Sequence, residues 1–158
     1  MLIALDPGPV STGFVVCDGG QITRSGCMRN EDIESQVFPL RPDGHTLAIE
    51  MIASYGMPVG REVFETCVWI GRFMEQWGAP SRVQLVYRKD VKMHLCGSPR
   101  AKDANIRQAL IDLYEPTGGG KTPQIGTKAK PGPLYGVSTH AWPALGVAVT
   151  VQAKAGSQ

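Results

Sequence analysis

The chain opens with two short apolar runs separated by a turn that is rich in glycine and proline. The first run, Leu2–Leu5, stops at Asp6-Pro7-Gly8, and the second run, Gly13–Cys17, follows within a few residues. Proline and glycine at such a break favour a tight reversal, so the two runs predict an antiparallel hairpin. A Gly-Gly turn and weak alternation over Gln21–Met28 predict a third antiparallel strand.

Helical and extended patterns alternate over the rest of the chain. Apolar residues recur every three or four positions within Arg61–Trp77, which predicts a helix there with one apolar face. That face consists of Val63, Cys67, Ile70, Met74 and Trp77. Weaker patterns predict short helix Glu31–Phe38, strands His45–Met51 and Val83–Tyr87, helix Ala101–Tyr114, polar loop Glu115–Tyr135 and a closing helix from about Ser138 to Val151. This order is typical of an α/β fold with a mixed sheet.

The size and composition of the chain are those of one globular domain. It has 158 residues, of which 42% are hydrophobic, enough for a single core. We expect one domain over residues 1–152 and a disordered tail over residues 153–158. No apolar run approaches the roughly 20 residues that a bilayer helix needs, so we expect no signal peptide, no membrane anchor and a cytoplasmic location.

Charge is divided unequally between the two halves of the chain. Residues 1–78 contain five Arg, no Lys and ten Asp or Glu, a net charge of −5, whereas residues 79–158 contain eleven Lys or Arg and four Asp or Glu, a net charge of +7. Such a division is expected when an acidic site in one half faces a polyanion held by the other. Two separately solvated surfaces would produce the same counts.

Two acidic residues stand in otherwise apolar strands. Asp6 ends the first predicted strand, and Glu50 lies near the end of the fourth. If these strands are neighbours, the two carboxylates lie within reach of one divalent cation, and Mg²⁺ prefers such oxygen ligands. Alternatively, each carboxylate accepts hydrogen bonds from a neighbouring turn.

Four segments resemble, in order, the motifs of RuvC-type Holliday junction resolvases in the ribonuclease H-like superfamily. They are residues 3–14 (the opening strand and hairpin), 48–50 (Ala-Ile-Glu), 101–110 (the basic helix) and 140–148 (the closing helix, in the form found in phage-encoded relatives). The resemblance extends from Met1 to about Thr150. It implies a ribonuclease H-like fold with a mixed five-stranded sheet flanked by helices. It also implies an endonuclease that cuts four-way junctions or other branched DNA as a homodimer, in a bacterial or phage-infected cell.

The resemblance also implies the residues of the active site. Asp6 and Glu50 match the first two metal ligands, and His140 takes the position of the third. The closing helix of the family usually carries one or two Asp residues, but here the matching positions are His140 and Pro143, and proline cannot bind a metal. Asp103 lies in the basic-helix motif and is either a further site residue or a helix cap. Two Mg²⁺ ions about 4 Å apart, for which Mn²⁺ substitutes, would serve phosphodiester hydrolysis.

DNA contacts are expected from basic residues and one aromatic side chain. Tyr55 is the only aromatic residue between Glu50 and Gly60. The resemblance implies that this loop reaches the junction centre, where Tyr55 would stack on an unpaired base. Alternatively, Tyr55 covers the edge of the sheet. The cations that would hold phosphates are Arg88, Lys89, Lys92, Arg100, Lys102 and Arg107.

The long helix has more apolar surface than one packing face needs. Phe64, Trp69 and Phe73 lie outside the predicted core face, and a symmetric dimer would cover them. Two other functions remain open. One is a junction-binding protein that no longer cuts DNA, and the other is a ribonuclease H-like nuclease that acts on a hybrid or flap.

Overall fold

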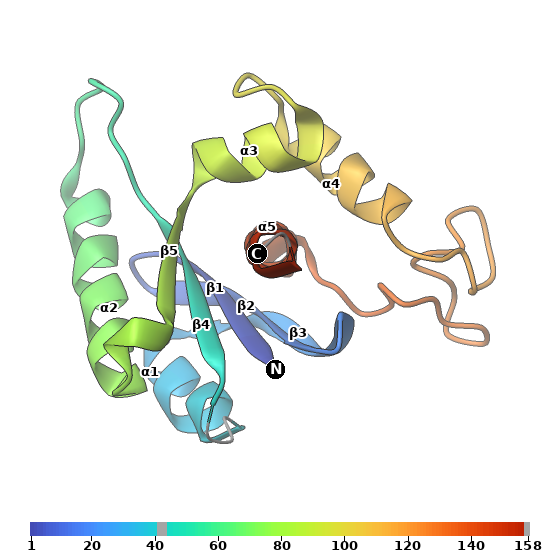
Figure 1. The fold of residues 1–158 in the computed structure, drawn as a ribbon, viewed down its shortest axis with the longest axis horizontal. Coiled ribbons are helices and arrows are strands. Elements are labelled where there is room, and N and C mark those ends of the chain that lie inside the picture. Colours follow the sequence, from blue (N-terminus) through green and yellow to red (C-terminus); the bar gives the residue numbers. More distant parts are fainter. Residues whose placement is uncertain (41–43, 157–158) are drawn as a thin grey trace.

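A mixed five-stranded sheet forms the centre of the molecule (Figure 1). The computed structural model describes residues 1–40 and 44–156. The strands are β1 (Leu2–Pro7), β2 (Ser11–Asp18), β3 (Gln21–Arg29), β4 (Thr46–Met51) and β5 (Val83–Tyr87), in the order β3-β2-β1-β4-β5. β1, β2 and β3 are antiparallel, whereas β4 is parallel to both β1 and β5. The predicted strands, the opening hairpin and the mixed sheet are confirmed.

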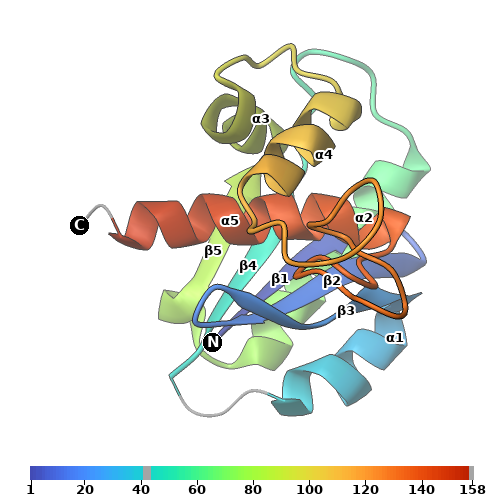
Figure 2. The ribbon, with the colours of Figure 1, turned by 90° about the vertical axis from the view of Figure 1, so that its right-hand side faces the viewer.

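Alternating residues of the central strands separate the core into two layers. Ile3 and Leu5 pack with α2 (Arg61–Trp77) and the helical segment that begins with α1 (Asn30–Asp32). Leu2 and Ala4 point to the opposite face, where they pack with α5 (Trp142–Gly156). This period of two is what a strand buried on both faces requires. Figures 1 and 2 show α2 on one side of the sheet and α5 on the other.

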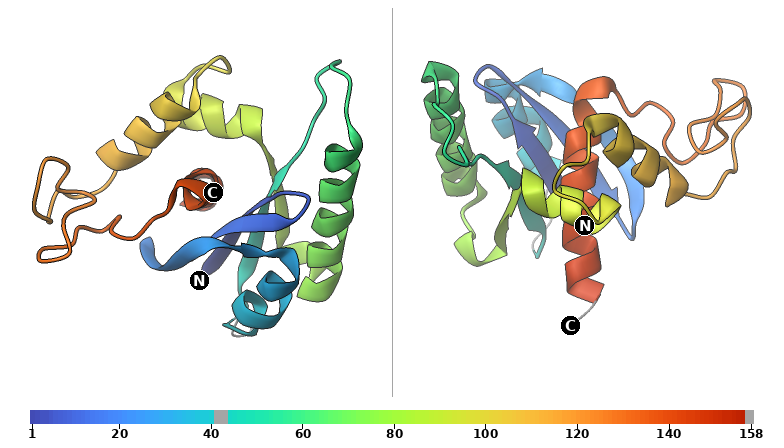
Figure 3. Two further views of the ribbon diagram at one scale, coloured as in Figure 1. Left: turned by 180° about the vertical axis from the view of Figure 1, so that it is seen from behind. Right: turned by 90° about the horizontal axis from the view of Figure 1, so that it is seen from above.

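Two shorter helices cover α5 on the side away from the sheet. They are α3 (Arg88–Cys96) and α4 (Asp103–Asp112), and both contact α5 (Figure 3). The sequence predicted α4 but missed α3, which follows β5 without an intervening loop. The only fully buried residue of α3 is Val91, so its apolar pattern is too short to indicate a helix.

The long helix has the predicted bounds, but its buried face is rotated. Thr66, Ile70, Phe73 and Trp77 are buried, whereas Cys67 is exposed. Phe38, from the segment after α1, packs edge-on against both Phe73 and Trp77 and draws this side of the helix into the core. Phe73 is therefore a core residue rather than surplus surface, and Trp69 is half-buried.

The C-terminal helix is longer than the sequence predicts. A 3-10 turn at Thr139–Ala141 leads into α5, so Pro143 lies in the first turn as predicted. α5 then continues to Gly156. The expectation of a disordered tail is wrong for residues 153–156, because the helix extends by about one more turn; residues 157–158 lie outside the described part.

The long polar loop has an internal network of backbone hydrogen bonds. Gly118 donates to the carbonyl of Pro123, Gly132 donates to that of Ile125, and Leu134 from this loop is fully buried. In the described ranges, no helix is long and apolar enough to cross a membrane.

Candidate active site

The strand register brings Asp6 and Glu50 to the same edge and face of the sheet. β1 and β4 are parallel, with Leu5 opposite Ile49, so Asp6 and Glu50 are the next residues along the two neighbouring strands. Alternation then turns both side chains toward the α5 side, as it does Ala4 and Ala48. The predicted proximity of the two acids is therefore confirmed.

Both carboxyl groups are destabilised as anions. Burial is the main cause that raises the pKa of Asp6 to about 6 and the pKa of Glu50 to about 7. The charge of Asp6 raises the pKa of Glu50 further, while the positive charge of Arg88 lowers both pKa values. Paired carboxylates that still lack sufficient positive charge are a donor set suited to a hard divalent cation.

The hairpin that follows Asp6 is held by two buried polar residues. Thr12 donates a hydrogen bond of 2.6 Å from Oγ1 to Oδ1 of Asn30, and Asn30 donates one of 3.0 Å from Nδ2 to the carbonyl of Gly8. Thr12 and Asn30 are fully buried, so these hydrogen bonds are shielded from water. The sequence interpretation missed both residues, whose only signal is their polarity within or beside a strand.

Arg88 lies among the acids. Its guanidinium contacts Oε2 of Glu50 at 3.4 Å and Oδ1 of Asp103 at 2.6 Å, and only 25% of its side chain is exposed. The sequence predicts Arg88 as one of six phosphate-binding cations, and that role stays a prediction. The structure adds that Arg88 lies in the acidic site, with both of these carboxylates as partners.

Asp103 begins α4 and faces Arg88 rather than capping its own helix. At that helix start, Asn105 accepts the hydrogen bond from the backbone N–H of Lys102 at 2.9 Å. The side chain of Asp103 is 82% exposed. The alternative interpretation of Asp103 as a helix cap is therefore wrong.

His140 reaches the site through a close contact between backbones. A Cβ on Gly13 would lie less than 3.0 Å from both the carbonyl carbon and the carbonyl oxygen of His140, so only glycine fits there. Gly13 is paired with Asp6 across the hairpin, and the charge of His140 lowers the pKa of Asp6. Glycine in strand β2 therefore lets the start of the closing helix approach the acid pair.

The predicted set of three metal ligands is not preassembled. Over residues 1–40 and 44–156, no group of three His, Cys, Asp or Glu side chains is arranged to hold a metal ion. Asp6 and Glu50 are neighbours, but His140 does not complete a three-ligand group with them. Mg²⁺ is usually held by one or two carboxylates together with water or substrate oxygens, so the two acids are donors of the kind that such an ion accepts.

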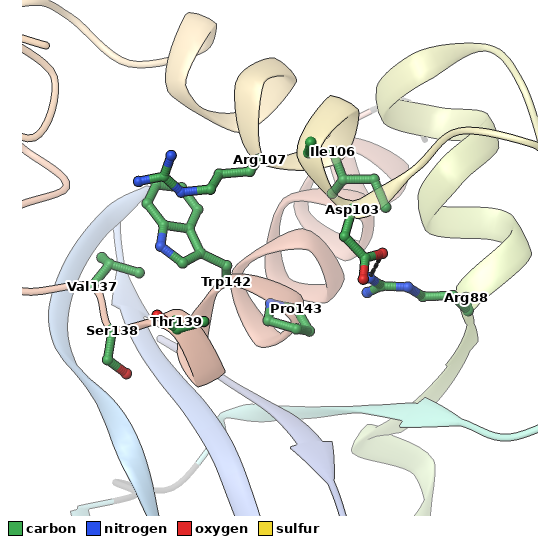
Figure 4. A pocket seen from close by; sticks show the side chains of 10 residues that line it. Arg88, Asp103, Ile106, Arg107, Val137, Ser138, Thr139, Trp142 and Pro143 are labelled. Carbon is green, nitrogen blue, oxygen red and sulfur yellow. Dashed lines mark hydrogen bonds and ion pairs between the residues drawn. The ribbon is translucent and has the colours of Figure 1, made fainter.

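A cavity of about 490 Å³ lies between α4 and the start of α5 (Figure 4), and Asp103 is the acid that lines it. Arg88 and Asp103 stand at one side of it, and Thr139, Trp142 and Pro143 line another. The guanidinium of Arg107 lies over the indole ring of Trp142, 4.8 Å from its centroid. The cavity thus combines apolar surface with the guanidinium groups of Arg88 and Arg107 and the carboxylate of Asp103.

A second hollow of about 390 Å³ connects the loop after β4 with α3. Tyr55, Arg88, Lys89, Lys92 and Pro99 line it. Tyr55 is 63% exposed and adopts a positive φ of 48°, so it does not cover the sheet edge. The structure therefore brings Tyr55 next to two of the predicted phosphate-binding lysines. The other predicted DNA-binding residues, Arg100, Lys102 and Arg107, are exposed around the start of α4.

The sheet order, the antiparallel opening hairpin and the helices on both faces define a ribonuclease H-like fold. No protein-family model and no curated protein sequence matches the chain. Among solved structures, the chain is similar to Thermus thermophilus RuvC in complex with a Holliday junction substrate, with a TM-score of 0.67 and 16% identity over 98% of this chain and 93% of that one. It is also similar to a second Thermus thermophilus RuvC structure, with a TM-score of 0.61 and 18% identity over 98% and 96% of the two chains. At these identities the similarity establishes the fold.

Proposed function

We propose that the protein is a divalent-metal-dependent endonuclease that resolves Holliday junctions or other branched DNA. The observation that carries the proposal is the partly buried pair Asp6 and Glu50, near the ends of neighbouring parallel strands and beside the basic helices α3 and α4. The similarity in fold to RuvC, including a RuvC bound to a Holliday junction, supports branched DNA as the substrate.

The residues of the site have separate roles in this proposal. Asp6 and Glu50 would hold Mg²⁺, for which Mn²⁺ substitutes, and the ion would supply an activated water and stabilise charge on the phosphate. His140 would accept a proton from the attacking water on its imidazole or add a ligand. Asp103 would hold Arg88 in place through their ion pair.

The basic surface would bind the arms of the DNA. Lys89, Lys92, Arg100, Lys102 and Arg107 would contact phosphates without regard to sequence. Exposed Tyr55, beside the basic helix α3, would stack on a base that is unpaired at the branch point.

A homodimer would place two such sites on one junction. In α2, Phe64 is 62% exposed and Val68 is 64% exposed, four residues apart on one face of the helix. Exposed apolar residues on a helix are suited to a symmetric contact, in which the same face is used twice. Two symmetric sites would cut two strands of a four-way junction in a coordinated way.

A labelled four-way junction incubated with Mg²⁺ tests the proposal. We expect symmetric nicks from the wild-type protein. Asp6→Asn and Glu50→Gln should each abolish cutting but keep or strengthen junction binding, because each removes a metal ligand and a negative charge. Asp18→Asn is the matched control, since Asp18 lies on the same sheet at the opposite end of strand β2 and should leave cutting unchanged. Near-normal cutting by Glu50→Gln would show that the site is wrongly assigned.

The same assay separates the second candidate function, a junction-binding protein without nuclease activity. That candidate is favoured by Pro143 in the closing helix and by the lack, in the part of the chain described, of a three-ligand group. It predicts tight junction binding and no product in Mg²⁺ or Mn²⁺. Faster cutting of a hybrid or flap than of a junction would instead indicate a different ribonuclease H-like activity.

His140 is tested by two replacements. His140→Ala should lose cutting while the fold is kept, and His140→Asp should keep substantial activity, because a carboxylate can both bind a metal and accept a proton. Full activity of His140→Ala would remove His140 from the mechanism.

A further inference from the structure

The strand pairing places Arg88 beside the end of β4, where Glu50 lies. Tyr87 is the last residue of β5 and pairs with Met51, the residue after Glu50. Arg88 follows at once as the first residue of α3, so its side chain starts beside the end of β4. Its two contacts, with Glu50 and Asp103, join an acid from the sheet to an acid from α4.

The acids available at the site are too few for two metal ions and an arginine. The three carboxylates of Asp6, Glu50 and Asp103 carry a charge of −3 when ionised, and Asp103 is already engaged by Arg88. Pro143 offers no ligand, and in the ranges that the structure describes no three potential ligand side chains form a metal-binding group. Mg²⁺ is usually held by one or two carboxylates together with water and substrate oxygens. Asp6 and Glu50 are therefore sufficient for one ion, and with Asp103 paired to Arg88 none of the three acids remains for a second.

Arginine is chemically suited to the role of a fixed cation. Its guanidinium stays charged at all physiological pH values, and its planar fork binds carboxylate and phosphate oxygens at the same time. Two ion-pair partners and partial burial hold the side chain in one place, so little order has to be gained when a phosphate arrives. Arg88 also lines both hollows of the site and therefore faces the space in which DNA would lie.

We infer that Arg88 takes the place of a second metal ion, so that each protomer binds one divalent ion at Asp6 and Glu50 and uses the Arg88 guanidinium as the other positive charge on the scissile phosphate. This inference rests on the proposed nuclease function. It differs from the two-ion site that resemblance to the RuvC-type resolvases implies.

The direct test counts bound Mn²⁺ by electron paramagnetic resonance on the full-length protein, without DNA and with junction DNA added. Wild-type protein should bind one Mn²⁺ per protomer at saturation in both samples. Two ions per protomer would overturn the inference and leave the proposed function intact. No bound Mn²⁺ in either sample would overturn both.

Cleavage by Arg88 variants gives a second, independent measurement. Arg88→Ala should slow cutting at saturating Mg²⁺ by about 100-fold or more, the usual effect of removing a group that stabilises charge in the transition state. Arg88→Lys, which keeps the charge without the fork, should lose less. Arg82→Ala is the matched control, because Arg82 is an exposed arginine directly before β5, at the end opposite Arg88, and should leave cutting unchanged. Circular dichroism checks that each variant is folded. Cutting by folded Arg88→Ala at the rate of Arg82→Ala would overturn the inference.

Discussion

Replacing Gly13 by alanine tests whether the closing helix is positioned by the opening hairpin. The new Cβ would overlap the backbone carbonyl of His140, and neither side of this contact has a flexible side chain that can rotate away. Strand β2 or the turn Thr139–Ala141 must therefore move by about 1 Å. Overpacking of this kind costs about 1 to 3 kcal/mol of folding free energy. For a chain of this size, each kcal/mol lowers Tm by roughly 2 to 4 °C.

The same displacement should have a larger effect on catalysis than on stability. Gly13 pairs with Asp6 and contacts His140, so the shift changes the spacing between two of the proposed catalytic residues. A displacement of about 1 Å at a reacting centre can cost about 100-fold in rate. Junction binding should be nearly unchanged, because the basic residues of α3 and α4 are not involved.

Thermal unfolding followed by circular dichroism and junction cleavage in Mg²⁺ measure the two effects. Gly71→Ala is the matched control, because a Cβ at Gly71 in the middle of α2 meets nothing within 4 Å. It should keep or raise Tm, since alanine is favoured over glycine in a helix by about 1 kcal/mol. A Gly13→Ala protein with the Tm and the cleavage rate of the wild type would refute the proposed packing of His140 on β2.

Three further predictions concern pH, salt and assembly. Burial raises the pKa of Glu50 from 4.5 to about 7. The folded metal-free protein therefore binds the proton of the Glu50 carboxyl more tightly than the unfolded chain does, and Tm should fall as pH rises from about 4.5 to 7. Glu50→Gln in EDTA should remove that part of the fall, and an identical pH profile would contradict the assignment. Lys102→Ala should reduce the slope of log affinity for junction DNA against log salt concentration by up to about one unit. Lys154→Ala, at the far end of α5, should leave that slope unchanged. Equal slopes for the two variants would place Lys102 away from DNA. Phe64→Glu should yield monomers in analytical ultracentrifugation. Leu113→Glu, at a similarly exposed apolar site, should leave the oligomeric state unchanged. Wild-type protein that sediments as a monomer at tens of micromolar would exclude the dimer.

Local patterns were sufficient to predict most elements and to single out the two acids. The opening hairpin and the bounds of α2 follow from turn residues and from periodicity within single segments. Asp6 and Glu50 stand out because each is an acid in an otherwise apolar strand. Their proximity depended on the two strands being neighbours, which the parallel pairing of β1 with β4 provides.

Contacts between distant segments decided the remaining features. The rotation of the buried face of α2 depends on Phe38, which reaches Phe73 and Trp77 from another part of the chain. α3 was missed because its short apolar pattern is completed only when Val91 packs under α5. In both helices, the packing that stabilises the observed buried face involves residues from a distant segment of the chain, which the local sequence does not contain.

The site shows the same division. The sequence by itself determined which acids and bases are present and that Asp6 and Glu50 lie in apolar strands, because side-chain alternation is a local consequence of the residue pattern. The tertiary structure makes those two strands neighbours. Only the tertiary structure decided that Arg88 joins Glu50 to Asp103, across 38 and 15 residues of sequence, and that the His140 backbone rests on Gly13. A cation among many in a basic segment has no sequence signal that distinguishes it, since its role depends on which acids the folded chain brings within ion-pair distance.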